Sequence, residues 1–577
     1  MMVRFIAFLF LATLAAATER PTRATIERFR DESVYLHGHY VAVKLPLQKG
    51  VPLWNPVAIA CREDGVLFAA NYTGEIYTLV DTDGDGIEDT ARLFADVKKD
   101  GLRYPTSLAF RGKEIYVGTT QEIRIYTDAD GDGVADTSRT FFKDFPNTLH
   151  RFDWTFGLTF AADGSLYFAL STDSYNPEPA ADPQAWRGSL LHISADAQKV
   201  ERIATGLRFT DGVAINPLGD LFFCDNHGGD NPTEELNFVQ PSHFYGHNPN
   251  KFGKPPVTTP PLVALQNGVA PTGLCFNRAD NDFGGTAGDL FVACWGPDWV
   301  FERGSIVRVR LFKQPDGSYR AQELPFAHEV PKASAVAFST QGDLYATLFG
   351  KETGGHQPYK EPVGAIYRFI AADWVPLGAP IKSKFPIVKG DVKSGEKLFS
   401  ERGCAACHAM NAEKETLGPD LGGIGEILTQ DEVLAAIRKP SESIKSGHET
   451  VQISKKDGAI LLGRLASTSV EELTLIIAGN QQLHIRRSEI ADTKTLPTSL
   501  MPEGLLNGLS DVQTGDLLAY LGVRDRSPGL LKGSLQKIES GLRYFFPKVS
   551  LKAKLGFIAL VVIAIMVAIR RKRRRSP

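Results

Sequence analysis

The sequence predicts a multidomain protein: an all-β six-bladed propeller, then a mostly α-helical domain with a small β insertion, then a C-terminal transmembrane helix. Three observations predict this order. They are a strand repeat within residues 51–375, the sequence Cys-Ala-Ala-Cys-His at 404–408, and an apolar run at 555–569. The length of 577 residues also fits more than one domain.

The chain begins with the features of a secretory signal. A basic Arg4 precedes an apolar run at 5–14, and Ala15, Ala16 and Ala17 follow it. Small residues after an apolar run are typical of a cleavage site. We therefore expect residues 1–17 to be a signal peptide and residues 18–50 to be an N-terminal extension.

Residues 51–375 repeat a phrase of a short apolar strand, a Gly turn and a second strand rich in aromatic residues. Six copies begin at Pro56, Pro105, Phe156, Asp211, Pro271 and Ala333. Repeated short strands without helical periodicity are typical of a β-propeller, whose blades bury their faces against their neighbours. The repeat is too long for the strand rhythm of a β-sandwich, which is about 8–12 residues. Six copies predict six blades.

Two of the repeats carry acidic loops with the same spacing. The carboxylates are Asp81, Asp83, Asp85 and Asp89 in the first loop, and Asp128, Asp130, Asp132 and Asp136 in the second. Alternating carboxylates around a Gly turn supply the hard oxygen ligands that Ca²⁺ prefers. An EF-hand would also need a Glu at its twelfth position, which both loops lack. Calcium sites and solvated acidic hairpins remain the two interpretations.

Cys404, Cys407 and His408 have the spacing that attaches haem c. Two thiols form thioethers with the porphyrin, and the following His supplies an axial nitrogen to the iron. A thioredoxin-like pair lacks this His, and a zinc site needs a second ligand pair that does not follow here. The sequence therefore predicts covalently bound haem c.

A second iron ligand is expected on the opposite haem face, and a Met thioether is common there. The chain has five Met. Two belong to the signal, one lies in the C-terminal apolar run and one lies only two residues after His408, too close to reach the opposite haem face, which leaves Met501. His448 and His484 are the alternatives.

The haem domain, residues 385–524, is interrupted by a segment that reads as strands. Residues 449–492 alternate apolar runs with the turn sequences Lys-Asp-Gly at 456–458 and Ala-Gly-Asn at 478–480. A small β module thus lies between the haem motif and Met501. It is either a cover for the haem edge or a surface for docking or ligand binding.

A linker at 525–554 leads to the apolar run at 555–569, which is shorter than the roughly 20 residues that usually span a bilayer. The basic tail at 570–577 resists translocation, so we expect it in the cytoplasm and the rest on the periplasmic side. A sorting signal removed after export is the alternative. The net charge of -3 argues against a nucleic-acid partner.

Two runs carry a family resemblance. Residues 206–222, with 225–230, 235–237 and 245–246, resemble the quinoprotein glucose and aldose sugar dehydrogenases. Those are six-bladed propellers that bind pyrroloquinoline quinone and Ca²⁺. With the haem motif and residues 418–421 and 500–505, the chain more closely resembles the exported propeller and haem fusions of Planctomycetes and Verrucomicrobia, often labelled membrane-bound dehydrogenases.

The resemblance implies roles for two propeller residues. His150 matches the general base that acts on the sugar hydroxyl, and Arg208 matches the Arg that contacts the quinone. Phe209 stands where the family has Asn, and the sequence around His150 also departs from the family pattern.

Two functions follow as hypotheses. In the first, the propeller oxidises a sugar or alcohol, and the tethered haem passes the electrons to a periplasmic or membrane acceptor. In the second, the propeller binds a glycan or a protein, and the haem domain is an independent electron carrier or sensor.

Overall fold

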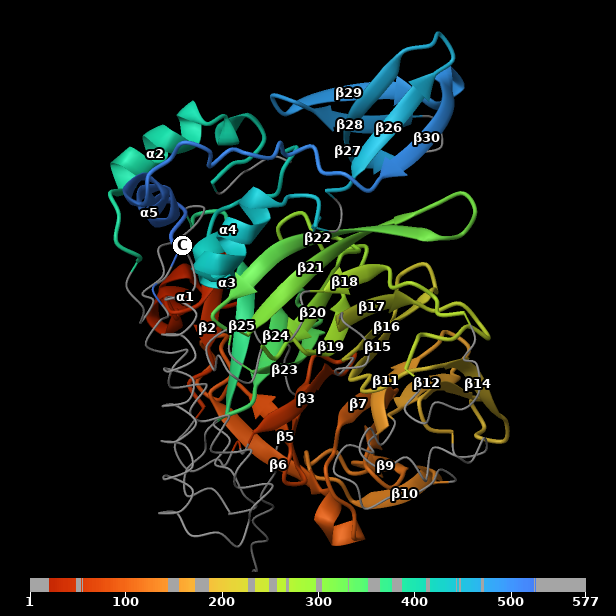
Figure 1. The fold of residues 1–577 in the computed structure, drawn as a ribbon. Helices are drawn as coiled ribbons and strands as arrows, with labels where there is room; N and C mark the ends of the chain where they lie inside the picture. The colour runs from red at the N-terminus through yellow and green to blue at the C-terminus, as the bar shows by residue number, and fades with distance from the viewer. Residues whose placement is uncertain are drawn as a thin grey trace, which may run out of the picture.

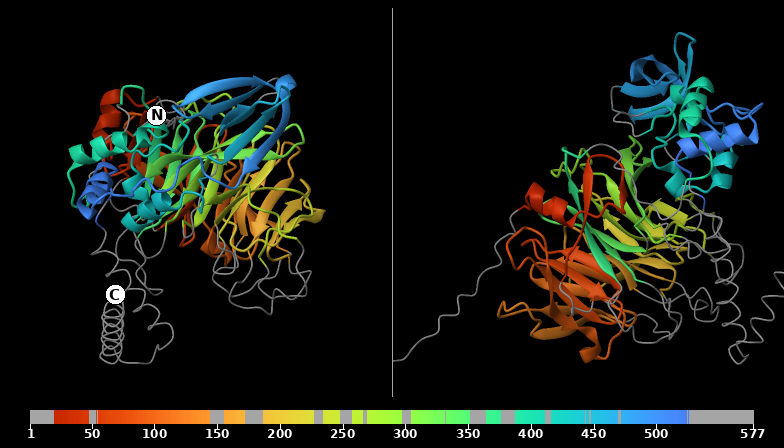
Figure 2. Two further views of the ribbon diagram at one scale, coloured as in Figure 1. Left: turned by 45° about the horizontal axis from the view of Figure 1, so that its top comes forward. Right: turned by 90° about the vertical axis from the view of Figure 1, so that its left-hand side faces the viewer.

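In the computed structural model, the described residues form a ring of β-sheets and a smaller, partly helical domain on one side of it (Figure 1, Figure 2). The structure describes residues 20–525 except 48–52, 54, 144–154, 172–185, 227–233, 248–256, 266–268, 297–303, 331, 351–363, 376–386, 411–415, 443, 446–447, 469–471 and 524.

The ring contains six sheets, and each begins at one of the six repeats. Sheets 1 to 3 are β3 (Pro56–Cys61), β4 (Leu67–Asn71), β5 (Glu75–Val80) and β6 (Thr90–Asp96); β7 (Ser107–Arg111), β8 (Glu114–Gly118), β9 (Ile123–Thr127) and β10 (Thr137–Phe142); and β11 (Thr155–Phe160), β12 (Leu166–Leu170), β13 (Ser189–Ile193) and β14 (Val200–Thr205). The 3-10 helix η1 (Val97–Asp100) joins sheets 1 and 2.

Sheets 4 to 6 continue the same antiparallel pattern. They contain β15 (Gly212–Ile215), β16 (Leu221–Asp225), β17 (Glu234–Phe238) and β18 (Val263–Leu265); β19 (Pro271–Phe276), β20 (Leu290–Cys294), β21 (Ser305–Lys313) and β22 (Tyr319–His328); and β23 (Ala333–Phe338), β24 (Leu344–Leu348) and β25 (Ala365–Ala371). The first strands of neighbouring sheets contact one another in turn, and β23 contacts β3, so the ring closes. The region is a six-bladed β-propeller.

Apolar faces and hydroxyl groups join neighbouring blades. Phe68 and Ile76 of sheet 1, for example, share a buried cluster with Leu108 and Ile115 of sheet 2. The Ser334 hydroxyl donates to the Pro56 carbonyl at 2.7 Å and so links the last blade to the first. Because each blade packs only against its neighbours, the core is a set of inter-blade layers.

The N-terminal segment belongs to the ring, which differs from the expectation of an extension at 18–50. After α1 (Arg23–Phe29), the short strand β1 (Tyr35–Leu36) pairs with β22, and β2 (Tyr40–Lys44) pairs with β25 as the fourth strand of sheet 6. Residues 40–43 are all buried. A buried apolar strand needs a partner, but the local sequence does not say which of the distant strand edges supplies it.

The haem domain contains the helices α2 (Val392–Glu401), α3 (Ile424–Ile427), α4 (Gln430–Arg438) and α5 (Asp511–Tyr520), with the 3-10 helix η3 (Cys404–Ala406). Helices α2 and α5 cross closely because a Cβ on Gly395 would lie 2.0 Å from the Asp516 carbonyl oxygen. The Asp391, Thr429 and Ser510 side chains cap the starts of α2, α4 and α5.

The inserted module is a five-stranded antiparallel sheet. Its strands are β26 (Thr450–Lys455), β27 (Ile460–Thr468), β28 (Glu472–Ile477), β29 (Gln481–Arg486) and β30 (Ile490–Leu496), with the 3-10 helix η4 (Arg487–Glu489). Both predicted turns join strands, but the sheet extends to Leu496 because β30 pairs with β26.

The haem domain contacts the propeller at sheet 5. Lys445 lies 3.6 Å from Glu323 of β22, and the Tyr35 ring of β1 lies against Gly423, where a Cβ would be 2.5 Å from it. Among the described residues, no helix has the length and apolar character needed to cross a membrane. The predicted signal peptide at 1–17, the transmembrane segment at 555–569 and the basic tail at 570–577 lie outside the described residues, as does nearly all of the linker at 525–554.

Candidate functional site

The haem motif forms a tight turn directly after α2. Gly403 has a φ of 79°, a conformation that favours glycine, and it starts η3. The amide of His408 donates to the Cys404 carbonyl at 2.9 Å, which keeps the three motif residues on one turn. Both thiols are free and half-buried. The turn therefore leaves Cys404 and Cys407 available for thioether bonds.

The His408 ring is held through its Nδ1 atom, which lies 2.8 Å from the Pro419 carbonyl oxygen. With Nδ1 protonated, Nε2 keeps its lone pair for iron. Burial lowers the pKa of His408 and so favours the neutral, ligating form. The ring fits because residue 418 is Gly, where a Cβ would lie 2.4 Å from Cε1 of His408. These features fit a proximal haem ligand.

The walls of this site come from three parts of the chain. Cys404 packs against the cluster that contains Phe399 of α2 and Leu517 of α5. Cys407 and Leu500 pack against a second cluster, formed by Leu417 with Ala466 and Ile476 of the insertion. The inserted sheet thus contributes apolar surface beside the haem motif.

The three candidates for the second iron ligand differ in their surroundings. Met501 is half-buried, and its amide donates to Ser499 at 3.1 Å, next to Leu500 of the cluster that contains Cys407. His448 is 3.2 Å from the Leu417 carbonyl through Nδ1, and burial lowers its pKa to about 3. His484 is exposed on β29, where its Nδ1 lies 3.6 Å from Glu472. His484 therefore has the surroundings of a surface residue.

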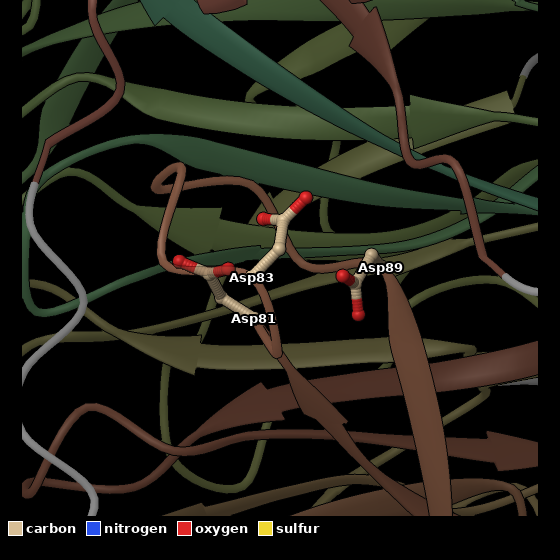
Figure 3. A group of neighbouring side chains, drawn as sticks. All are labelled: Asp81, Asp83 and Asp89. Carbon is tan, nitrogen blue, oxygen red and sulfur yellow. The ribbon is translucent and has the colours of Figure 1, made fainter.

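The first acidic loop brings three of its four predicted carboxylates together (Figure 3). Ligand atoms of Asp81, Asp83 and Asp89 lie within 4.8 Å of one another. Asp81 accepts from the amides of Gly84 and Gly86, both at 2.8 Å, which folds the loop around that carboxylate. Three converging carboxylates fit a hard cation such as Ca²⁺.

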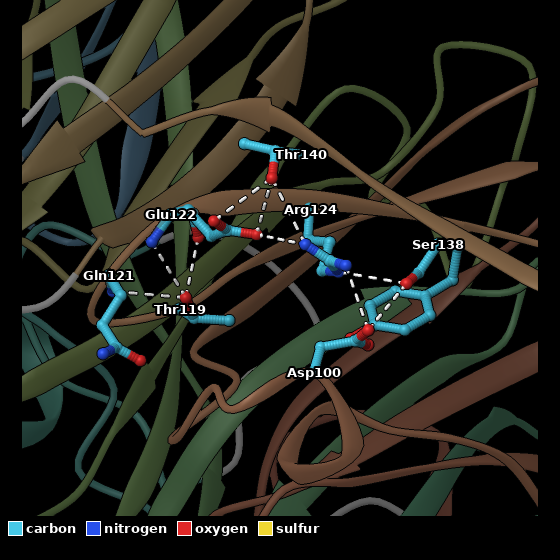
Figure 4. Close-up of polar contacts among 8 residues, drawn as sticks. Asp100, Thr119, Gln121, Glu122, Arg124, Ser138 and Thr140 are labelled. Atoms are coloured by element: carbon cyan, nitrogen blue, oxygen red, sulfur yellow. Dashed lines mark hydrogen bonds and ion pairs between the residues drawn. The ribbon is translucent and has the colours of Figure 1, made fainter.

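The second acidic loop repeats this arrangement. Asp128, Asp130 and Asp136 group within the same 4.8 Å limit. The loop is anchored to sheet 1 because the Ala135 amide donates to the Phe94 carbonyl at 2.9 Å. The strands β9 and β10 that carry the loop also bind η1, since Arg124 and Ser138 both contact Asp100, at 3.0 and 2.9 Å (Figure 4).

The fourth carboxylate of each loop lies outside these groups. Asp85 accepts from the amide of Ile87 at 3.0 Å, and Asp132 accepts from the amide of Val134 at 2.8 Å. Both cap the loop backbone instead, which the residue spacing alone does not reveal.

Of the two residues predicted for the propeller site, the structure describes only Arg208. His150 lies outside the described residues. Arg208 precedes β15, and its guanidinium donates to the Asn226 carbonyl at 2.7 Å. Successive strands of a sheet run in opposite directions. The acidic loops join third and fourth strands, whereas the segment with Arg208 joins one sheet to the next. Arg208 and the acidic loops therefore lie at opposite faces of the ring.

Two buried carboxyl groups beside Arg208 are not predicted from the sequence. Asp225 accepts from the Arg208 amide at 2.9 Å and from the Phe209 amide at 2.8 Å. Burial, together with the charge of Asp225, raises the pKa of Asp211 well above its usual range. Their positions relative to the predicted strands are the sequence signal for both. Asp211 directly precedes the strand that begins at Gly212, and Asp225 is the last residue of the following strand.

Comparison with protein families divides the chain in the same way. Residues 53–290 match a family described as a domain of unknown function, DUF7133. Residues 392–459 match the cytochrome c family. This part of the chain is a cytochrome c domain. The match covers α2, the haem motif, α4 and the start of the insertion. Electron transfer through haem c is therefore the function of this part of the chain.

Solved structures similar to the propeller include three sugar-oxidising proteins. They are a glucose dehydrogenase-like oxidoreductase of Thermus thermophilus (20% identity, 56% of this chain and 100% of that chain, TM-score 0.42), the soluble aldose sugar dehydrogenase of Escherichia coli (17%, 57% and 99%, 0.43), and the quinone-bound aldose sugar dehydrogenase of Streptomyces coelicolor (16%, 58% and 99%, 0.43). No curated protein matches the sequence.

Proposed function

We propose that the protein is an exported, membrane-anchored c-type cytochrome in which the propeller oxidises a sugar or alcohol and the haem accepts the electrons. The observation that carries the proposal is the His408 ring, held through Nδ1 beside two free thiols in a cytochrome c domain. When bound there, haem c supplies a one-electron carrier. A fused propeller would deliver electrons to it at high effective concentration.

Met501 is our proposed second iron ligand. Its loop lies beside the cluster that contains Cys407, whereas His448 binds the same backbone segment that holds the proximal His408. A His that shares the support of the proximal ligand is poorly placed for the opposite haem face. Met501→Ala should therefore lower the haem potential, because a Met ligand raises it.

Calcium and pyrroloquinoline quinone are the proposed cofactors of the propeller. The two groups of three carboxylates support Ca²⁺. The quinone rests on the family resemblance, with Arg208 as its contact and His150 as the base on the substrate hydroxyl. Oxidation of an alcohol releases two electrons and two protons. Because haem c carries one electron at a time, it would accept the two electrons in turn and pass the first to the acceptor before it takes the second.

The deciding experiment is an absorption spectrum of the exported domain, expressed with haem maturation. Haem bands should become reduced after addition of the quinone, Ca²⁺ and an aldose, and not after any one of them alone. Arg208→Gln is a matched variant that keeps a hydrogen-bonding side chain but removes the charge. It should slow reduction by sugar while dithionite still reduces its haem fully.

The second function is a propeller that binds a glycan or a protein, with the haem domain as a separate carrier or sensor. The observation that favours it is Phe209, which stands where the sugar dehydrogenases have Asn and packs edge-on against Phe156 at 5.0 Å between ring centres. In this case dithionite would reduce the haem and no sugar would, with or without the quinone.

The location and partners are part of the same proposal. The signal at 1–17 and the apolar run at 555–569 support export and anchoring, with the tail at 570–577 in the cytoplasm. The electron acceptor would then be a periplasmic or membrane component. Release of the mature protein by detergent, and not by salt, would test the anchor.

A further inference from the structure

The inserted sheet does more than cover apolar surface beside the haem motif. The segment 416–419 runs between the insertion and His408, and insertion residues hold its backbone from one side. Arg464 of β27 donates from Nε to the Thr416 carbonyl at 3.0 Å. Asn480 accepts from the Leu417 amide through Oδ1 at 2.8 Å.

His448, at the entry to the insertion, holds a third group of the same segment. Its Nδ1 lies 3.2 Å from the Leu417 carbonyl oxygen. Three side chains thus bind three consecutive polar groups of the backbone, namely the carbonyl of residue 416 and both groups of residue 417. A cover that only excluded water would need apolar contacts and not this set of hydrogen bonds.

The other end of the segment holds the iron ligand. The Gly418 amide donates to the Cys407 carbonyl at 2.8 Å, and the Pro419 carbonyl accepts from Nδ1 of His408 at 2.8 Å. Gly418 and Pro419 follow Leu417 directly. A shift of Leu417 would therefore change the geometry of the hydrogen bond to the His408 ring.

The tip of one insertion hairpin reaches both haem loops. Ile477 pairs with Gln481, so residues 478–480 form a three-residue turn. In this turn the Gly479 amide donates to the Ala406 carbonyl at 3.2 Å, while Asn480 binds Leu417. Asn480 has a φ of 58°, which Asn tolerates better than most residues. The turn is thus built to present one amide and one side-chain oxygen to the haem motif.

The insertion side of the contact is shielded from water, and the three hydrogen bonds are partly buried. Arg464 is 1% exposed, and Leu417 and Ile476 are also buried. Hydrogen bonds in such surroundings are stronger than in water, and losing one partner leaves a buried group unpaired. The three contacts therefore restrict the position of the segment.

We propose that the insertion positions the proximal haem ligand, with Asn480 as the principal positioning residue and Arg464 and His448 in support. Through Leu417 it fixes the Pro419 carbonyl against His408, and this hydrogen bond increases the basicity of the imidazole. A more basic ligand stabilises ferric iron. The insertion thereby sets the reduction potential of the haem. This inference rests on the proposed haem c.

The test compares two substitutions of one residue. Asn480→Gly keeps the backbone conformation and removes the oxygen that binds Leu417, whereas Asn480→Asp keeps an acceptor oxygen. We expect the midpoint potential of Asn480→Gly to rise by about 59 mV, a tenfold shift in the ferrous-to-ferric ratio for one electron. Asn480→Asp should not raise the potential, because it keeps the acceptor and its negative charge favours ferric iron.

A third variant separates positioning from hairpin stability. Asp457→Gly removes a side chain from the tip of another hairpin, where Asp457 caps the Ala459 amide at 3.0 Å. It should weaken the hairpin and leave the potential unchanged.

Spectroelectrochemistry on the haem-loaded exported chain gives the potentials. A haem stain after denaturation measures covalent haem independently. An unchanged or lowered potential in Asn480→Gly, with haem attached, would overturn the positioning role and leave the cytochrome assignment intact. Absence of attached haem in the wild type would overturn both.

Discussion

The haem domain and the propeller assemble their candidate sites in different ways. In the haem domain, Cys404, Cys407 and His408 lie on one turn, and the segment at 416–419 that holds His408 follows shortly after. In the propeller, Arg208 comes from a connection between sheets 3 and 4, and its predicted partner His150 lies before sheet 3. A site within one turn can be read from residue spacing, whereas a site between blades depends on how the ring closes.

The largest expected effect is a loss of haem that leaves the propeller intact. Cys404→Ser with Cys407→Ser removes both thioethers, so no haem should remain bound after denaturation. Because the propeller closes through its own strands, its unfolding midpoint should stay unchanged. A haem stain and thermal unfolding measure the two results. A propeller that fails to fold without haem would contradict the view that the two regions fold independently.

The second effect is the reverse, a propeller change that leaves the haem intact. Arg368 of β25 is fully buried and donates to Asp343 at 2.8 Å and to the Gly86 carbonyl at 2.6 Å, across the junction of sheets 6 and 1. Arg368→Met leaves buried acceptors unpaired and should cost about 3–5 kcal/mol in urea unfolding. The haem spectrum should not change.

A matched control for this substitution is an exposed ion pair. Lys397 of α2 lies 3.6 Å from Glu401, and both side chains are mainly exposed. Lys397→Met should cost less than about 0.5 kcal/mol. Equal costs for Arg368→Met and Lys397→Met would show that the junction is not held by its buried charges.

The third effect concerns the contact between the two regions and appears on acidification. His328 of β22 is 7% exposed, next to the rings of His37 and Tyr35 and near Lys445, and burial lowers its pKa to about 3. The unfolded chain therefore binds the proton more readily than the folded chain. Stability should be complete above the ordinary His pKa of about 6.5 and fall below it, by about 2 kcal/mol at pH 5.

Urea unfolding at several pH values measures this loss, and His328→Gln provides the comparison. The variant removes one titrating group and should lose about 2 kcal/mol less than the wild type between about pH 6.5 and 5, while other histidines whose pKa is lowered by burial, such as His37 and His448, keep their own share of the pH dependence. If the wild type and the variant lose stability in parallel, His328 is not the cause.

The smallest effect tests whether a site in the propeller can be predicted from residue spacing along the chain, as the haem motif can. With Ca²⁺ at ten times its dissociation constant, binding should add about 1.4 kcal/mol of stability for each occupied site. Asp83→Asn with Asp130→Asn should reduce this gain, because both residues belong to the groups of three carboxylates. Asp85→Asn with Asp132→Asn should not. An unfolding titration distinguishes the pairs, and equal losses would contradict the assigned ligand sets.

The sequence predicts most of what depends on short spacing. The six repeats coincide with the six first strands, and the turn of the haem motif follows from residues 403–408. The two acidic loops also have the local folds that alternating Asp and Gly suggest. In each case the residues that interact are neighbours along the chain.

The remainder depends on contacts between distant segments. Ile87 is fully buried while Val134, at the same position of the second loop, is 49% exposed, because different blades lie beside the two loops. The contact between Asn480 and Leu417 joins the insertion to a loop in the haem domain. Residue spacing contains no information on such pairs, so it does not distinguish a cover for the haem edge from a positioning role for the insertion.

The pairing of β2 with β25 has a consequence for synthesis. Residues 40–44 leave the ribosome early, yet their partners at 365–371 are made only after every other strand of the ring. The ring therefore cannot close cotranslationally until the last blade has emerged, and such long-range pairing slows folding. For the export proposed above, slow closure of the ring would leave the chain unfolded for longer, as passage through a membrane requires.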